Sequence, residues 1–250
     1  MNCWLQQIAE GENMGHARGQ VGGHVGGYFG ILMQLLRDRP GFMEEVNQGI
    51  KLEQKIIALL VASSILFTVY GAVIGSFTGG LQIVASAIKL PALYLITLVI
   101  CLPTLYFFNI LFGSNRSFAQ HFALLLSSVS LISLLLCSFA PITLFFRLSV
   151  LDYEFFKLLN VVIFAVTGLI GVNAFYQAMR PTELESQTDT KTRQKILQLW
   201  LVLYGFVGSQ MGWILRPFFG APNKDFELFR NLEGNIYSHV LDAVKNILGF

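Results

Sequence analysis

The strongest constraint on this chain is a series of long apolar runs that contain no Asp, Glu, Lys or Arg. A helix of about 20 apolar residues crosses the hydrocarbon core of a bilayer, which is about 30 Å thick. Helices are favoured there because the bilayer core offers no water to bond free backbone groups. We therefore predict an all-α, polytopic transmembrane bundle whose five spans comprise residues 56–77, 92–112, 119–146, 158–179 and 196–215.

The composition agrees with this prediction. Hydrophobic residues make up 54% of the chain and charged residues only 13%, whereas soluble domains carry about 25% charged residues. The chain therefore lacks the polar residues needed to cover a water-facing surface, and we expect the lipid bilayer to be its main surrounding. A net charge of +2 without a basic run gives no indication of nucleic-acid binding.

The polar segments divide the chain into three parts. Residues 1–55 form a cytosolic segment, residues 56–216 the transmembrane domain and residues 217–250 a tail. In the first part, a flexible glycine-rich stretch is favoured over a glycine-faced helix for Gly11–Gly30. Two amphipathic helices at the cytoplasmic membrane surface follow, Tyr28–Arg39, which stops at Pro40–Gly41, and Met43–Lys55.

The tail carries apolar residues at every fourth position, which predicts an amphipathic C-terminal helix; these are Leu232, Ile236, Val240, Val244 and Leu248. The stretch Gly79–Lys89 is interpreted as a semi-apolar connector, with the alternative that it dips back into the membrane. Pro91 then fits a helix start, and Pro103 is expected to kink the second span.

The distribution of Lys and Arg predicts the orientation. With five spans, the N-terminal segment and the loops at 113–118 and 180–195 lie on one side and hold ten of the 17 Lys and Arg residues. Because positively charged segments are retained on the cytoplasmic side, we expect the N-terminus to be cytoplasmic. If the fifth run, which contains Gln198, Ser209 and Gln210, does not span, the tail moves to that side as well.

No pattern in the chain indicates catalysis. The five runs lack the ionisable groups that mark proton pathways and voltage sensors, and His121 is more simply explained as an interfacial hydrogen-bonding residue. The serines of the third run have no partner base, and Cys3, Cys101 and Cys137 lack metal-ligand spacing. We expect no catalytic residue, no metal site and no cofactor, and hence a protein that is not an enzyme.

Small residues at helical spacing are the strongest positive signal. They occur at the end of the first run and in the fifth, and they are Gly71, Gly75 and Gly79, and Gly205, Gly208 and Gly212. Such stripes let a second helix approach closely. Packing within the bundle is the favoured interpretation, and pairing with another membrane protein or a second copy is the alternative.

The segment after the fifth run combines aromatic residues with arginine. Trp213 can anchor at the membrane interface, and Arg216 can extend to the headgroups. The alternative is a docking site, because aromatic and Arg side chains are favoured at interface hot spots; its candidate residues are Trp213, Arg216, Phe218, Phe229 and Arg230.

A local resemblance runs from Tyr70 to about Leu125. It consists of YGAVIGSFTGG, a Lys-x-Pro entry at Lys89–Pro91, the turn GSNRSF and an aromatic-Gln step at Phe118–Gln120. The chain resembles the Yip1 family, whose members have a cytosolic N-terminal segment followed by five closely spaced membrane helices. The resemblance implies a non-enzymatic membrane organiser that acts through helix–helix and cytosolic contacts, and it implies no catalytic residue.

Two functions remain open on the sequence. The first is a non-catalytic scaffold, organiser or assembly factor that binds partners through its glycine faces and terminal tails. The second is a passive transporter or channel, whose polar residues would have to line one path; they are Asn109, Asn160, Asn173, Gln177 and Gln210. Amides gathered around a wet cavity would favour the channel, and dry packing with outward glycine faces would favour the scaffold.

Overall fold

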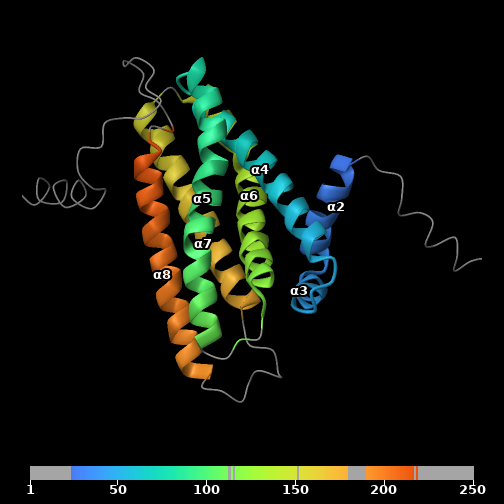
Figure 1. Ribbon diagram of the computed structural model, residues 1–250. Helices are drawn as coiled ribbons and strands as arrows, with labels where there is room; N and C mark the ends of the chain where they lie inside the picture. The colour runs from blue at the N-terminus through green and yellow to red at the C-terminus, as the bar shows by residue number, and fades with distance from the viewer. Residues whose placement is uncertain are drawn as a thin grey trace, which may run out of the picture.

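The computed structural model describes residues 24–111, 114, 116–150, 152–179, 190–216 and 218, which contain helices and no strand (Figure 1). The helices are α2 (His24–Arg37), α3 (Arg39–Asn47), α4 (Leu52–Gly75), α5 (Leu81–Leu111), α6 (Phe118–Ser149), α7 (Tyr153–Ala178) and α8 (Thr190–Ile214). The predicted all-α class is therefore confirmed.

Four helices of the described part, α4 to α7, are long and apolar enough to cross a membrane. The multi-pass character predicted from the sequence is thus supported by four helices. The fifth predicted run forms α8, but α8 is not among these four. Its polar side chains, such as Gln198 and Gln210, lower its apolar content relative to the others.

Helix α6 lies at the centre of the bundle. It packs against α4 on one side and α7 on another, while α4 also contacts α5 and α2, and α8 lies along α5 (Figure 1). The buried hydroxyls of α6 bond mainly to carbonyls of their own helix: Ser127 to Leu124 at 2.7 Å and Ser133 to Ser130 at 2.8 Å. Small side chains satisfied in this way let α4 approach α6 without leaving polar groups unbonded in an apolar interior.

Two glycines of α4 allow the backbone of α5 to come close. A Cβ atom at Gly71 would lie 2.5 Å from the Ser86 carbonyl oxygen, and one at Gly75 would lie 2.6 Å from the Gln82 carbonyl oxygen. No side chain fits at that distance, so the α4–α5 hairpin depends on these two positions. Gly79 has a different role, because it lies in the turn after α4 with a φ of 75°.

The start of the second long helix differs from the sequence prediction. Helix α5 begins at Leu81, so most of Gly79–Lys89 is helical and the predicted connector is wrong; Pro91 lies inside the helix instead of at its start. With 31 residues, α5 is about 46 Å long at 1.5 Å per residue. It exceeds the thickness of a bilayer core and carries the buried Lys89 within its first turns.

The N-terminal helices also differ from their predicted bounds. Helix α2 begins at His24, so the last seven residues of Gly11–Gly30, including Gly27 and Gly30, are helical, whereas residues 11–23 lie outside the described residues. The predicted helix Met43–Lys55 is wrong: α3 ends at Asn47, and a turn separates it from α4.

Helix α3 begins at the residues that the sequence prediction treated as the end of a helix, Pro40 and Gly41. Pro40 occupies the first turn of α3, where its missing N–H is no loss. The Asp38 side chain caps the helix by accepting a hydrogen bond from the Gly41 N–H at 3.0 Å. The Pro-Gly pair therefore starts a helix here.

Replacing Gly75 with Ala is expected to destabilise the bundle by about 1–3 kcal/mol, the usual cost of overpacking. The added methyl group would meet the α5 backbone, which has no flexible end to move away. The measurement is the melting temperature in detergent micelles, followed by circular dichroism.

Gly168→Ala is the matched control, because a Cβ atom at Gly168 of α7 would meet no atom within 4 Å. Alanine is the better helix former, so this variant should melt at or above the wild-type temperature. Equal melting temperatures for both variants would contradict the role of Gly75.

Candidate functional site

Several polar side chains inside the bundle are bonded to one another or to their own helices. Asn160 of α7 is fully buried; its Oδ1 accepts a hydrogen bond from the Tyr70 hydroxyl of α4 at 2.9 Å, and its Nδ2 donates to the Phe156 carbonyl at 2.8 Å. Asn109 donates to the carbonyl of Leu105 at 2.9 Å. These groups fasten helices and satisfy backbone carbonyls.

The remaining candidates for a polar path are spread along the bundle. Asn173 and Gln177 are exposed on α7, and Gln177 Nε2 donates a hydrogen bond to Asn173 Oδ1 at 3.4 Å. Asn173 is thirteen residues beyond Asn160 on the same helix, which corresponds to about 20 Å along the axis. Gln210 lies on α8. The described residues therefore do not bring the five amides to one shared path.

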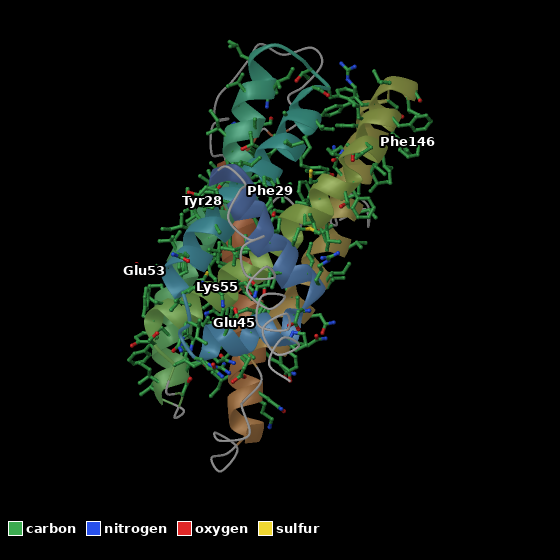
Figure 2. All side chains as sticks on the ribbon, turned by 90° about the vertical axis from the view of Figure 1, so that its right-hand side faces the viewer. Tyr28, Phe29, Glu45, Glu53, Lys55 and Phe146 are labelled. Atoms are coloured by element: carbon green, nitrogen blue, oxygen red, sulfur yellow. The ribbon has the colours of Figure 1, made fainter. Side chains whose placement is uncertain are left out.

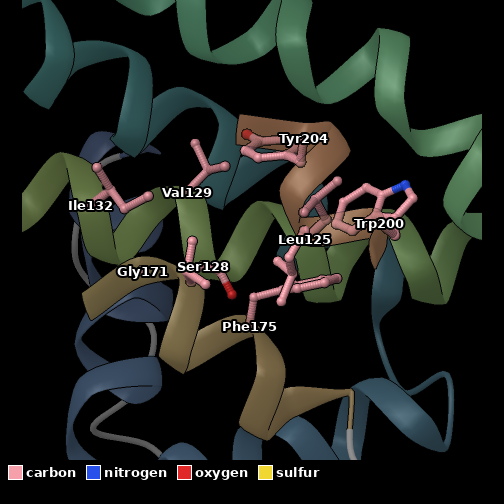
Figure 3. Close-up of a pocket in the computed structure, with 10 residues that line it drawn as sticks. Leu125, Ser128, Val129, Ile132, Gly171, Phe175, Trp200 and Tyr204 are labelled. Atoms are coloured by element: carbon pink, nitrogen blue, oxygen red, sulfur yellow. The ribbon is translucent and has the colours of Figure 1, made fainter. Parts of the chain in front are cut away.

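A small cavity lies between α6, α7 and α8 (Figure 3). Its volume is about 20 Å³, enough for about one water molecule. Its walls are almost entirely apolar, with Trp200 and Tyr204 on one side and Phe175 on another. None of the five candidate amides lines it.

Trp200 connects α8 with α5 and with α7. Its Nε1 donates a hydrogen bond to the Cys101 carbonyl of α5 at 3.3 Å, and its ring lies 5.4 Å from the rings of both Phe175 and Tyr204. The indole therefore combines apolar packing with a satisfied N–H group, as buried tryptophans require.

At one end of the bundle, α3 is fastened to α4 by an ion pair. The Nζ atom of Lys55 lies 2.6 Å from Oε2 of Glu45, which also accepts a hydrogen bond from Gln34 at 3.2 Å. The Lys55 side chain is buried over the Phe42 ring, 4.9 Å from its centroid. The hydrogen bond and the positive charge of Lys55 lower the pKa of Glu45 below its usual value.

Two further bonds connect α3 to the rest of the bundle. Nη2 of Arg39 donates to the Ala174 carbonyl near the C-terminal end of α7 at 2.5 Å, where a positive charge also complements the helix dipole. Gln120 of α6 donates through Nε2 to the Asn47 carbonyl at 2.5 Å. Partial burial lowers the pKa of Arg39, but an arginine remains charged. Helix α3 thus bridges α4, α6 and α7.

At the opposite end, the residues after α8 contact the α4–α5 hairpin. The Phe218 carbonyl accepts hydrogen bonds from Gln82 at 3.2 Å and from Ser86 at 2.5 Å. The Arg216 guanidinium stacks on the Trp213 ring at 3.5 Å. Arg147 of α6 donates to the Ser76 carbonyl, through Nη2 at 2.8 Å and Nε at 3.2 Å, and so bonds a free carbonyl at the end of α4.

The glycines predicted as packing or partner faces take different positions. Gly71 and Gly75 face α5 inside the bundle. On α8, a Cβ atom at Gly208 would lie 3.7 Å from Thr97 Cγ2, whereas Cβ atoms at Gly205 and Gly212 would meet nothing within 4 Å. Phe229 and Arg230, two of the predicted docking residues, lie outside the described residues.

His121 is fully buried at the start of α6. Its Nδ1 lies 3.0 Å from the Ser117 carbonyl oxygen, and its ring meets Tyr106 edge-on at 5.6 Å between centroids. Within the described part of the chain, no group of three or more His, Cys, Asp or Glu residues is placed to hold a metal ion.

Sequence reasoning did not find the residues that fasten α3. Arg39, Glu45 and Gln120 are ordinary polar residues of short segments, and their partners are far away in the chain. The available signal was Lys55, a cation immediately before an apolar run, where a charge requires a partner or the water surface.

No family model, curated protein or solved structure matches this chain. The fold therefore defines the protein at the level of its class: an all-helical protein whose helices are compatible with a multi-pass position in a membrane.

Acid is expected to weaken the attachment of α3 to α4. A carboxyl whose pKa is lowered in the folded state stabilises that state above its unfolded pKa, and the stabilisation is lost as the pH falls through the lowered value. For Glu45, this loss of stabilisation takes place at pH values below the ordinary pKa of 4.5. The melting temperature of wild type should therefore exceed that of Glu45→Gln at pH 7, and the difference should shrink as the pH falls below 4.5.

Glu53→Gln is the control, because it removes an exposed carboxylate from the first turn of α4, at the same end of the molecule. It should lower the melting temperature at pH 7 less than Glu45→Gln does, because only a favourable helix-dipole interaction is lost. A difference between wild type and Glu45→Gln that stays constant from pH 7 to pH 3 would exclude the ion pair as its cause.

Proposed function

We propose that this protein is a non-catalytic integral membrane scaffold with five spans, a cytoplasmic N-terminus and a partner-binding face on α8. The observation that carries the proposal is the one-sided packing of α8. Its inner face contacts α5 through Gly208 and Trp200, while Gly205 and Gly212 have open space beside them. Helices in membranes associate closely at such positions.

The position of α8 supports its role as a fifth span. It lies beside α5 and runs in the opposite direction (Figure 1). Its 25 residues correspond to about 37 Å, more than the thickness of a bilayer core. Because α8 lies along the candidate span α5 over this length, we expect both helices to be in the same environment, the bilayer.

The proposed orientation rests on the distribution of positive charge at the ends of the helices. Helix α3 with the adjoining end of α2, the end of α5, the start of α6 and the start of α8 lie towards one end of the bundle (Figure 1). The segments at this end contain many positively charged residues: Arg37, Arg39, Lys51, Lys55, Arg116, Lys191, Arg193 and Lys195. Such a bias favours the cytoplasmic side.

The interior supports a scaffold more than a passive channel. Conduction needs polar groups along one continuous path, whereas Asn160 and Asn109 bond to neighbouring groups within the bundle, and Asn173 and Gln177 lie on an outer surface. The proposed plan is also that of a Yip1-like organiser, and this resemblance remains part of the proposal.

Replacing Gly205 and Gly212 with Leu is expected to release the partner. Two leucines would cover the face that a partner helix approaches, and recovery of the partner should fall roughly tenfold, which corresponds to about 1.4 kcal/mol. The measurement is purification from the native membrane in mild detergent, followed by the mass of the intact complex and identification of its components.

Gly168→Leu is the matched control, since it places the same side chain on another open position, on α7. It should retain the partner. Equal loss in both variants would contradict a specific α8 face. A wild-type protein that purifies without any partner would count against the scaffold, and flux into liposomes would then be measured.

The two ends of the chain are expected on opposite sides of the membrane. A tag at the N-terminus should be cleaved by a protease added to the cytoplasmic side, and a tag at the C-terminus should be protected. Two accessible tags would show that α8 does not span. Protection of the N-terminal tag alone would reverse the proposed orientation.

A further inference from the structure

Helix α2 extends along α4 in the direction of the bundle interior, although the sequence places it on the membrane surface. Figure 2 shows Tyr28 and Phe29 on the Phe146 side of Lys55 and Glu45, along the long axis of the bundle. The contact between α2 and α4 buries Leu32 and Leu35 completely or nearly so.

The depth of α2 can be measured from its charged end. Gln34 and Lys55 both bond to Oε2 of Glu45, so Gln34 lies at the level where the charge-free part of α4 begins. Gly27 is seven residues before Gln34, which corresponds to about 10 Å along the helix axis. Half of a bilayer core is about 15 Å thick. The segment from Gly27 to Leu36 therefore fits within one leaflet.

The charged residues of α2 and α3 lie on one side of the level defined by Gln34 and Lys55. Arg37, Asp38 and Arg39 follow one another directly after the apolar part of α2, and the next charged residues, in α3, lie beyond them. The stretch from Gly19 to Leu36 contains no Asp, Glu, Lys or Arg. A charged group is costly inside a bilayer core. A helix whose only Asp, Glu, Lys or Arg residue lies at its last position, as in α2, is therefore suited to partial insertion.

The outer face of α2 exposes no charged side chain between Gly27 and Leu36 and carries exposed apolar side chains near the level of Gln34. Met33 is 51% exposed and Leu36 38% exposed, and Gly27 and Gly30 are exposed beside them. The neighbouring helix α4 also exposes apolar side chains, among them Ile57 and Ile65. Non-aqueous surroundings are tolerated by the α2 backbone because it is helical and packed on protein.

We propose that α2 is a re-entrant helix that enters one leaflet beside α4, and that its outer face from Gly27 to Leu36 binds the acyl chains of that leaflet. The proposal requires the α4–α7 bundle to lie in a membrane and does not depend on the scaffold function. The bonds of Glu45, Arg39 and Gln120 hold the α3 end of this unit, and Leu32 and Leu35 hold α2 against α4.

The test measures the surroundings of single spin labels in vesicles of phosphatidylcholine and phosphatidylglycerol. In a background with Cys3, Cys101 and Cys137 replaced by Ala, the label is attached through Gly30→Cys or Met33→Cys. Ile65→Cys on α4 is the control for the bilayer interior, and Gln48→Cys in the turn after α3 is the control for water. Collisions are measured with oxygen, which enters the bilayer, and with a water-soluble nickel chelate.

The label at Gly30 is expected to approach the label at Ile65, with high oxygen and low nickel accessibility. The label at Met33, near the level of Gln34, is expected to lie between those at Ile65 and Gln48. Nickel accessibility equal to that at Gln48 would place α2 in water and overturn the proposal. Protection from both reagents would identify a protein occupant, such as a second copy of the chain, and would equally overturn it.

A second measurement needs no substitution. The unmodified protein is irradiated in vesicles whose lipids carry a diazirine on the acyl chain, and the modified peptides are identified by mass spectrometry. Adducts are expected on the segment from Gly27 to Leu36 and on the exposed face of α4. Adducts on α4 without any on α2 would overturn the acyl-chain contact while leaving the membrane position of the bundle intact.

Discussion

The architecture depends on the close contact that α4 makes with two of its neighbours, α5 and α6. On the α5 side, Gly71 and Gly75 bring two backbones to a distance that no side chain allows. On the α6 side, small hydroxyl side chains bond to their own helix and leave a smooth surface. In a bilayer, helix association relies on such close van der Waals packing because lipid tails are as apolar as the helices. Helix α2 in turn packs on α4, and α8 on α5.

Polar interactions act mainly at the two ends of this bundle. At one end, Glu45, Arg39 and Gln120 connect α3 with three different helices. At the other, Arg147 and the Phe218 carbonyl connect the α4–α5 hairpin with α6 and with the residues after α8. The pattern is physically consistent, since charges and free carbonyls are least costly near the membrane surface. It leaves the middle of the bundle mainly to apolar contacts and to hydroxyls that bond to their own helix, such as Ser127 and Ser133.

These contacts divide the surface of the molecule into faces with different partners. The inner glycines of α4 are used within the chain, whereas Gly205 and Gly212 of α8 remain beside open space. The outer face of α2 lies at the depth of the first apolar turns of α4. A scaffold that meets a protein on α8 and lipid on α2 would use two separate surfaces, so each can be altered without disturbing the other.

The sequence alone determined the all-α class and the position of the long apolar helices, because their length and lack of charge leave few alternatives in or near a bilayer. It also located the small-residue stripes. It placed the start of α5 too late and ended a helix at Pro40, since Pro is compatible with both the first turn and a break. Which glycines face inward, and that Arg39, Glu45 and Gln120 fasten α3, was decided only by the tertiary structure. Those contacts join residues far apart in the chain, such as Arg39 and Ala174, and depend on the directions in which packed helices point, which local sequence patterns do not contain.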